Sequence, residues 1–257
     1  MVADFCEVLE NKQCIDALAQ VTPSLIAVAS SSLHGSNWGG SIHLVKPGEG
    51  ILHSRAVPCG VPDLCAAGGR GLLVAAEDSG DIAVYSVGED LPLELAPASV
   101  LAEHHDIVSC VCSCTSSPAK IVSGSWDTSI KLWDIGGGEE SIASLTTLWD
   151  PLGDSAGVVV DACWESTGGT ADVVACCFRG KMLKLWDTRE AAKKGTAQEI
   201  SLPSVPCCVT WAQHSIAIGC EDGSVALIDS RAPAEPWTVT KVPDPKAKGH
   251  HQIPNLA

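Results

Sequence analysis

Long hydrophobic runs and a basic leader are both missing from this sequence. No stretch approaches the roughly 18 uninterrupted apolar residues of a membrane span. Residues 1–7 hold acidic side chains and no basic flank, which is unlike a secretory signal. We therefore expect a soluble, intracellular protein with no membrane partner.

Basic residues are also scarce. Lys and Arg number 16 against 31 Asp and Glu, which gives a formal charge of −15. This balance argues against direct nucleic-acid binding, because phosphates require a basic face. It suits a basic protein partner, which a negative field would attract. The alternative is that the acidity only confers solubility.

The thirteen cysteines lack the distribution of a disulfide framework. Cys110, Cys112 and Cys114 alternate along one expected strand, and residues 176–177 and 207–208 are adjacent pairs. Neighbouring residues on a strand point to opposite faces. We interpret these cysteines as small buried residues in a reducing compartment. The alternatives are redox sensing and a zinc site, but one extended strand rarely turns three thiols toward one metal. No metal or cofactor is predicted.

The clearest structural signal is a hairpin at residues 120–135. Ile121 and Val122 begin an apolar strand, residues 125–129 form a polar turn, and residues 130–133 form a second strand that ends in Trp133-Asp134. This pattern is typical of one blade of a WD-repeat β-propeller, in which each blade is a four-stranded sheet.

The pattern recurs along the chain at intervals of 40, 48, 53 and 42 residues, with the second strand ending at Val45, Tyr85, Trp133, Trp186 and Ile228. Expected inner strands precede four of the hairpins, at residues 63–65, 107–112, 158–164 and 207–211. A single blade cannot cover both of its faces, so stability must come from stacking. The sequence therefore predicts an all-β WD-repeat propeller with five recognisable blades.

We expect three segments. Residues 1–20 form an N-terminal segment without clear repeat character, in which residues 11–19 could be a short helix or an outer strand. Residues 21–237 contain the blades. Residues 238–257 form a tail that we expect to be disordered, because it is rich in proline and lysine and lacks strand alternation.

A candidate partner-binding site lies in the first blade. Residues 31–40 are expected to form its turn, a polar loop in which Trp38 stands between Asn37 and the pair Gly39 and Gly40. An exposed aromatic residue in such a loop would suit a pocket on a partner, because tryptophan is enriched at interface hot spots. The alternative is that Trp38 folds back onto its own blade.

A second group of residues is expected to be structural. In WD repeats a histidine before the inner strand can join a hydrogen-bond network, and here the candidates are His104, Ser123, Asp127 and Trp133. A His–Asp–Ser set also suggests a hydrolase, but no Gly-x-Ser-x-Gly elbow or oxyanion loop accompanies it. We therefore predict that the protein is not an enzyme.

A third group, Trp186, Asp187 and Arg189, closes the fourth hairpin, and residues 228–231 echo it. Trp-Asp-x-Arg at this position resembles the box by which some WD-repeat proteins dock onto cullin ubiquitin ligases. A substrate receptor of such a ligase is therefore the alternative function. The motif also occurs often within this fold for purely structural reasons.

The loops carry a more specific resemblance. From about residue 10 to about residue 235 the chain resembles the WD-repeat subunits of the methylosome, most closely in residues 29–46, 70–80, 103–109, 122–134 and 185–189. The resemblance implies a seven-bladed, non-catalytic scaffold, cytoplasmic and nuclear, that forms a hetero-oligomer with the type II protein arginine methyltransferase. It also implies presentation of basic substrates such as histones and spliceosomal Sm proteins. In that family the first-blade loop tryptophan enters a pocket on the enzyme, and Trp38 is the matching position.

Two departures from that family pattern stand out. The family continues through two further blades, whereas here the pattern gives way to residues 241–257. A truncated product or an alternative transcript would lack the union of first and last strands, so we expect an unclosed propeller with a bare sheet edge. The other departure is local: Arg179-Gly180 replaces the acidic turn residue found at Asp78, Asp127 and Asp222.

Overall fold

The computed structural model describes residues 14–34, 37–67, 71–87, 97–136, 144–148, 156–166, 172–189, 198–231 and 238–241. These residues form five four-stranded antiparallel sheets, and in each sheet the strands follow one another in chain order. Within this part of the chain, no helix is long and apolar enough to cross a membrane.

The first two sheets come from the N-terminal half. The first sheet contains β1 (Cys14–Thr22), β2 (Leu25–His34), β3 (Asn37–Lys46) and β4 (Gly50–Val57). The second contains β5 (Asp63–Ala67), β6 (Leu72–Ala76), β7 (Ile82–Ser86) and β8 (Ser99–Leu101).

The other three sheets complete the arc. The third contains β9 (Val108–Ser113), β10 (Lys120–Ser125), β11 (Ile130–Asp134) and β12 (Ser144–Leu148). The fourth contains β13 (Val159–Trp164), β14 (Val173–Phe178), β15 (Met182–Asp187) and β16 (Gln198–Ser201). The fifth contains β17 (Pro206–Ala212), β18 (Ser215–Cys220), β19 (Ser224–Asp229) and β20 (Thr238–Lys241).

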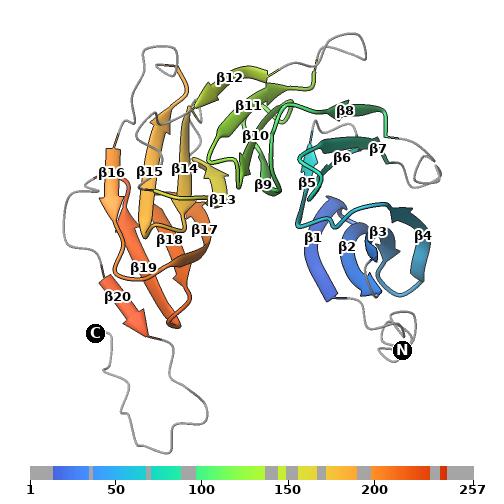
Figure 1. Cartoon of the computed structure of the whole chain (residues 1–257), viewed down its shortest axis with the longest axis horizontal. Coiled ribbons are helices and arrows are strands. Elements are labelled where there is room, and N and C mark those ends of the chain that lie inside the picture. Colours follow the sequence, from blue (N-terminus) through green and yellow to red (C-terminus); the bar gives the residue numbers. More distant parts are fainter. Residues whose placement is uncertain are drawn as a thin grey trace, which may run out of the picture.

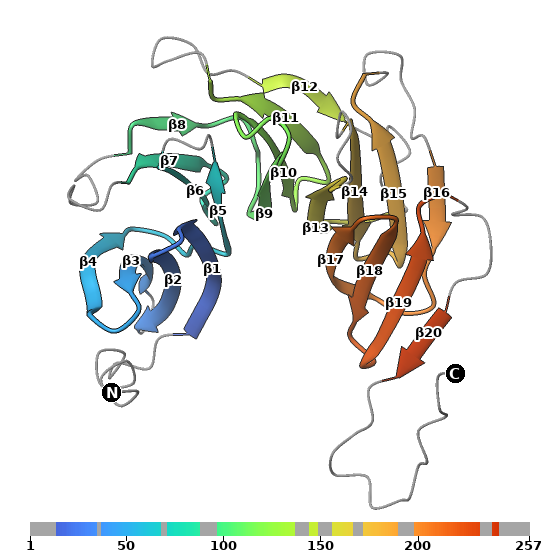
Figure 2. The same cartoon turned by 180° about the vertical axis from the view of Figure 1, so that it is seen from behind.

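The sheets stand around a common axis as blades of a propeller. Figure 1 shows the first strands β1, β5, β9, β13 and β17 on the concave side and the fourth strands on the outside. Each of these first strands contacts the first strand of the neighbouring sheet. The view from behind in Figure 2 shows the same arc, with the first and fifth sheets at its two open ends.

The strand-end positions that defined the sequence repeat are equivalent in space. Each lies on the third strand of its sheet and is paired with an apolar residue of the second strand: Val45 with Ile26, Tyr85 with Leu73, Trp133 with Ile121, Trp186 with Val174, and Ile228 with Ile216. All five strand-end side chains are buried. The prediction of five hairpins with a common register is therefore confirmed.

The core lies between neighbouring sheets. Four clusters of buried apolar residues join the first sheet to the second, the second to the third, the third to the fourth and the fourth to the fifth. Each cluster removes apolar surface from water that a lone sheet would expose, at about 25 cal/mol per Å². Stability therefore comes from stacking, as the repeat pattern predicts.

The sheets extend beyond the range of 21–237 predicted for the blades. β1 begins at Cys14 and is the first strand of the first sheet, so the expectation of a short helix or an outer strand there is wrong. Its buried positions are Ala17 and Ala19, whereas Leu18 between them is 65% exposed. Because the larger apolar residue points outward, the sequence pattern hides this strand.

The C-terminal end of the sheets also differs from the prediction. β20 pairs with β19 over Thr238–Lys241, so the segment expected to be a disordered tail supplies the last strand of the fifth sheet. The remainder of that segment, residues 242–257, lies outside the described residues, as do residues 1–13.

Candidate binding site between two exposed tryptophans

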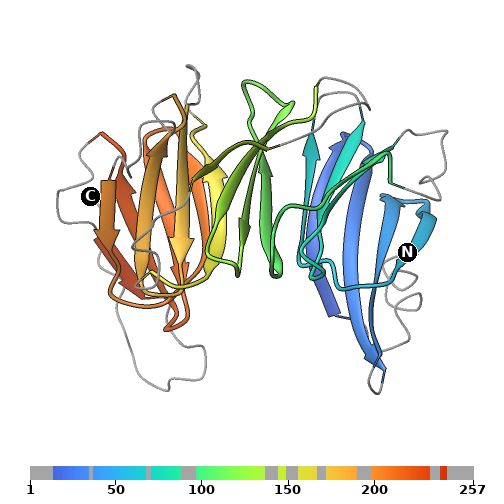
Figure 3. The same ribbon diagram turned by 45° about the horizontal axis from the view of Figure 1, so that its top comes forward.

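The candidate partner-binding residues lie on a long hairpin. β2 and β3 each have 10 residues, whereas the corresponding strands of the other sheets have 5 or 6. In Figure 3 this blue hairpin extends past the ends of the neighbouring strands. Asn37, Trp38, Gly39 and Gly40 belong to β3, and β2 extends to His34, so the prediction of a loop is wrong for residues 31–34 and 37–40; residues 35–36 lie outside the described residues.

The two glycines after Trp38 have different surroundings. A β-carbon at Gly40 would lie 2.4 Å from the carbonyl oxygen of Cys59, a distance that no real side chain accepts. A β-carbon at Gly39 would meet nothing closer than the carbonyl oxygen of Val57, at 3.7 Å. Gly40 therefore allows β3 to approach the segment that leads from the first sheet to the second, and Gly39 is not required for packing.

Trp38 is 49% exposed and leans over that same segment. A β-carbon at Gly60 would lie 2.3 Å from Nε1 of Trp38 and 2.6 Å from a carboxylate oxygen of Asp78. The indole edge and the carboxylate thus occupy the space that a side chain at Gly60 would need. Trp38 rests against the connection to the next blade instead of its own, and half of its surface stays in contact with solvent.

A cavity of about 650 Å³ opens beside Trp38. It lies where the second and third strands of the first three sheets meet: Trp38 comes from the start of β3, and Asp78 and Trp126 come from the turns between β6 and β7 and between β10 and β11. Its remaining walls come from Cys14, Asp16, Ser31, Gly60, Val61, Pro62, Ile107 and Ser109. Trp126 is 43% exposed, so two large aromatic surfaces flank the cavity.

The turn that carries Trp126 is fixed by the predicted hydrogen-bond network. The structure joins all four residues: the indole N–H of Trp133 donates to Ser123 Oγ at 2.8 Å, Ser123 Oγ lies 2.8 Å from His104 Nε2, and His104 Nδ1 lies 3.0 Å from the Asp127 carboxylate. Indole only donates and carboxylate only accepts. Nδ1–H of His104 therefore donates to Asp127, and the Ser123 hydroxyl can donate to Nε2.

Asp127 also binds the backbone around it. Its carboxylate accepts N–H groups of His105 and Ser129, and its own N–H donates to Ser125 Oγ. Although burial opposes ionisation, hydrogen bonds from His104 and Ser129 and from these N–H groups hold the pKa of Asp127 far below its usual range. The network therefore keeps a charged, rigid turn directly behind Trp126.

The possible ligase-docking residues are used within their own turn. Arg189 donates from its backbone N–H and guanidinium to the carboxylate of Asp187, and Arg231 does the same with Asp229. Trp186 is buried, so a partner could reach only the other two residues of the motif. The recurrence of this clamp in two blades shows that it closes a strand, and ligase docking stays a prediction.

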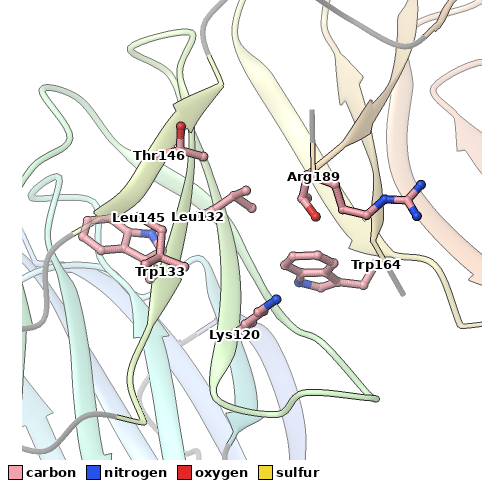
Figure 4. Close-up of a pocket in the computed structure, with 8 residues that line it drawn as sticks. Lys120, Leu132, Trp133, Leu145, Thr146, Trp164 and Arg189 are labelled. Atoms are coloured by element: carbon pink, nitrogen blue, oxygen red, sulfur yellow. The ribbon is translucent and has the colours of Figure 1, made fainter. Parts of the chain in front are cut away.

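Arg189 also borders a smaller cavity of about 260 Å³ between the third and fourth sheets. Figure 4 shows Trp164 between Lys120 and Arg189, with the guanidinium of Arg189 turned away from the cavity. The indole N–H of Trp164 donates to the carbonyl of Cys112 in the neighbouring sheet, so this tryptophan serves packing between blades.

No disulfide bond joins the cysteines of the described residues to one another. Burial raises the pKa of Cys110 and Cys176 well above the usual value and that of Cys112 to about 11, so these thiols are protonated at neutral pH. Among the described residues, no three histidine, cysteine or acidic side chains are arranged to hold a metal ion.

Sequence reasoning missed the residues that complete the cavity. The sequence indicates only a polar turn around Trp126 and no clear repeat character around Asp16. The signal that could have found Trp126 is its place in the third hairpin, where it is a tryptophan in the turn between the second and third strands. A tryptophan in that turn cannot contribute to the strand core.

Comparison with known proteins finds similarity to one frog protein and to two fly proteins. No family model matches it. It is 30% identical to the "Methylosome protein WDR77" of Xenopus laevis over 217 residues, which cover 81% of this chain and 61% of that protein. It is 26% identical to "Protein valois" of Drosophila melanogaster over 261 aligned residues, which cover 90% of this chain and 68% of that protein. "Protein Rae1" of the same fly matches 46% of the chain at 27% identity.

Proposed function

Since the chain is a WD-repeat protein similar to the Xenopus methylosome protein, we propose that it is a non-catalytic scaffold that binds a protein arginine methyltransferase. The chain spans 61% of the length of that relative, so the assignment concerns the blades that the two proteins share. We propose further that the enzyme is of type II, which dimethylates arginine symmetrically. The complex would be a hetero-oligomer of cytoplasm and nucleus.

The observation that carries the proposal is the position of Trp38. It stands on the one hairpin among the five described sheets whose strands are extended to 10 residues, and it is 49% exposed. An aromatic side chain displayed in this way costs little to bury in a partner pocket, because its free state is already ordered against Gly60. Truncation of such an anchor typically weakens binding by about 2 kcal/mol or more.

The charge of the chain supports the second half of the proposal, the presentation of basic substrates such as histones and Sm proteins. A net charge of −15 creates a negative field that concentrates basic chains near the scaffold. Such attraction weakens as ionic strength rises, because salt screens charges separated by more than about 8–10 Å. Substrate binding should therefore depend on salt more strongly than enzyme binding through an indole.

The test is capture of the purified methyltransferase by the unaltered chain, by Trp38→Ala and by Leu145→Ala. Leu145 is a matched control because it is 59% exposed on β12, an outer strand of the third sheet. We expect Trp38→Ala to lower the affinity about 30-fold, which corresponds to 2 kcal/mol, and Leu145→Ala to leave it unchanged. If the unaltered chain does not bind the enzyme, or if Trp38→Ala binds as well as the unaltered chain, the proposal is wrong.

A further inference from the structure

The cavity between Trp38 and Trp126 has the composition of a site for a cationic side chain. We propose that it binds the guanidinium group of an arginine in an extended basic peptide. This inference deepens the proposed presentation of basic substrates and rests on it, because it names the surface that would hold them. It assigns a role to Trp126, Asp78 and Asp16, which play no part in the proposed enzyme contact, and a second role to Trp38, which makes that contact.

The walls offer two kinds of attraction for a planar cation. Indole faces attract cations through the ring quadrupole, and Trp126 and Trp38 are 43% and 49% exposed beside the cavity. Asp16 and Asp78 are the only charged residues among its described lining residues, and both are acidic. A guanidinium group can stack on an aromatic face while it donates hydrogen bonds in its plane to a carboxylate. The site therefore suits arginine better than lysine, whose ammonium is a compact and strongly hydrated charge.

The size of the cavity points to a peptide. A volume of about 650 Å³ lies in the usual range of ligand pockets and exceeds what one side chain fills. The cavity is also bordered by Gly60, Val61 and Pro62, which leave one wall free of long side chains. An extended segment with small residues next to arginine could lie along this wall and place its guanidinium between the two rings.

The site is ordered before any ligand arrives. The backbone N–H of Trp126 donates to the backbone carbonyl of Ile107 at 2.9 Å, and the network around Asp127 fixes the same turn. Trp38 lies against Gly60 and Asp78. Because both tryptophans are already placed, binding would lose little conformational entropy.

The test is a calorimetric titration of the chain with a nine-residue peptide of alternating glycine and arginine, at low salt. The same peptide with citrulline in place of arginine keeps the shape and removes the charge. A third peptide carries lysine. We expect the arginine peptide to bind, the lysine peptide to bind about 5-fold more weakly, and the citrulline peptide to bind at least 10-fold more weakly.

Variants then locate the site. We expect Trp126→Ala to lower the affinity for the arginine peptide about 10-fold and Asp78→Asn to lower it about 5-fold. Leu145→Ala and Glu49→Gln serve as controls for an exposed apolar residue and for an exposed carboxylate in the turn after β3, and should bind as the unaltered chain does. Circular dichroism confirms that each variant is folded, and Asp16→Asn replaces any variant that is not.

The outcomes separate this inference from the enzyme contact. Equal binding of the citrulline peptide would show an apolar pocket, equal binding of the lysine peptide would show non-specific charge attraction, and unchanged binding by Trp126→Ala would place the peptide elsewhere. Each of these results overturns the inference. Capture of the methyltransferase by Trp126→Ala is measured separately and is expected to persist, so loss of peptide binding with retained enzyme capture supports the arginine site. If the unaltered chain fails to capture the enzyme but still binds the arginine peptide, only the proposed enzyme contact is wrong.

Discussion

Ser123 and Trp133 meet through a buried hydrogen bond of 2.8 Å from the indole N–H to the serine hydroxyl. The two residues sit at diagonal positions of the second and third strands of the third sheet, since Ser123 pairs with Lys131 and Ile121 with Trp133. In the fourth sheet the corresponding positions hold Cys176 and Trp186. The third blade therefore has a buried side-chain hydrogen bond between its second and third strands, at a position where the fourth blade has a cysteine in place of the serine.

Removing the shared hydroxyl should destabilise the fold. Ser123→Ala leaves the N–H of Trp133 and Nε2 of His104 without their partner in a buried site. We expect a loss of about 1–3 kcal/mol in the free energy of unfolding, because a buried polar group left unsatisfied costs that much. Urea denaturation followed by circular dichroism measures the change. The control is Ser201→Ala on the exposed side of β16, which should change the free energy by less than about 0.5 kcal/mol.

The two glycines of the long hairpin should respond differently to alanine. Gly40→Ala forces a β-carbon against the carbonyl oxygen of Cys59, and we expect a loss of about 1–3 kcal/mol from this overpacking. Gly39→Ala has ordinary van der Waals room and should change stability by less than about 1 kcal/mol. Thermal unfolding of the two variants compares them directly. Equal melting temperatures would mean that β3 can move away from Cys59 without cost.

Much of the fold could be predicted because the hairpins of the blades are both apolar and regularly spaced. Tyr85, Trp133 and Trp186 mark equivalent strand ends since bulky residues there fill the space between sheets. β1 could not be recognised, because its buried positions are alanines and its leucine points to solvent. In that strand the small side chains are buried and the large apolar side chain is exposed, which is the reverse of what the sequence pattern predicts.

The candidate site was less accessible to sequence reasoning. The polar residues around Trp38 favour a loop, but backbone pairing between β2 and β3 continues to the pair His34–Asn37. Strand pairing needs only backbone groups, so polar and glycine residues can extend a hairpin once its base is fixed by packing. The cavity depends on three parts of the chain about 40 to 50 residues apart, which are the start of β3 and the turns that hold Asp78 and Trp126. Only the curvature of the stacked sheets brings them together.

The stability of the chain should fall as the pH rises from about 4 to about 7. Burial raises the pKa of Asp63 to about 7 and that of Asp161 to about 6, against an ordinary value of 3.8. Between those values the folded state holds protons that the unfolded state has released. Stability therefore decreases with pH in this window, by about 1.4 kcal/mol per pH unit at most for each group.

The variants Asp63→Asn and Asp161→Asn should flatten this dependence. Each carboxylate accepts the N–H of a residue in the next blade, Val111 for Asp63 and Val209 for Asp161, and asparagine keeps only one of its two acceptor oxygens. The absolute stability at pH 4 should therefore drop, while the slope between pH 4 and pH 7 becomes smaller. Urea denaturation across that range measures both quantities. An unchanged slope in the double variant would assign the dependence to other groups.

The fourth blade offers the reverse of the Ser123 experiment. The indole N–H of Trp186 has no hydrogen-bond partner among the described residues, and Cys176 occupies the position of Ser123. In Cys176→Ser the new hydroxyl can accept this N–H, which offsets the cost of burying a hydroxyl group. The control is Cys177→Ser, which is equally buried on the same strand but faces the fifth sheet, among apolar residues. We expect Cys177→Ser to cost about 1–3 kcal/mol and Cys176→Ser to be close to neutral. Equal losses would mean that the backbone of this blade holds the side chain at position 176 too far from the indole of Trp186 to form the hydrogen bond that Ser123 and Trp133 make.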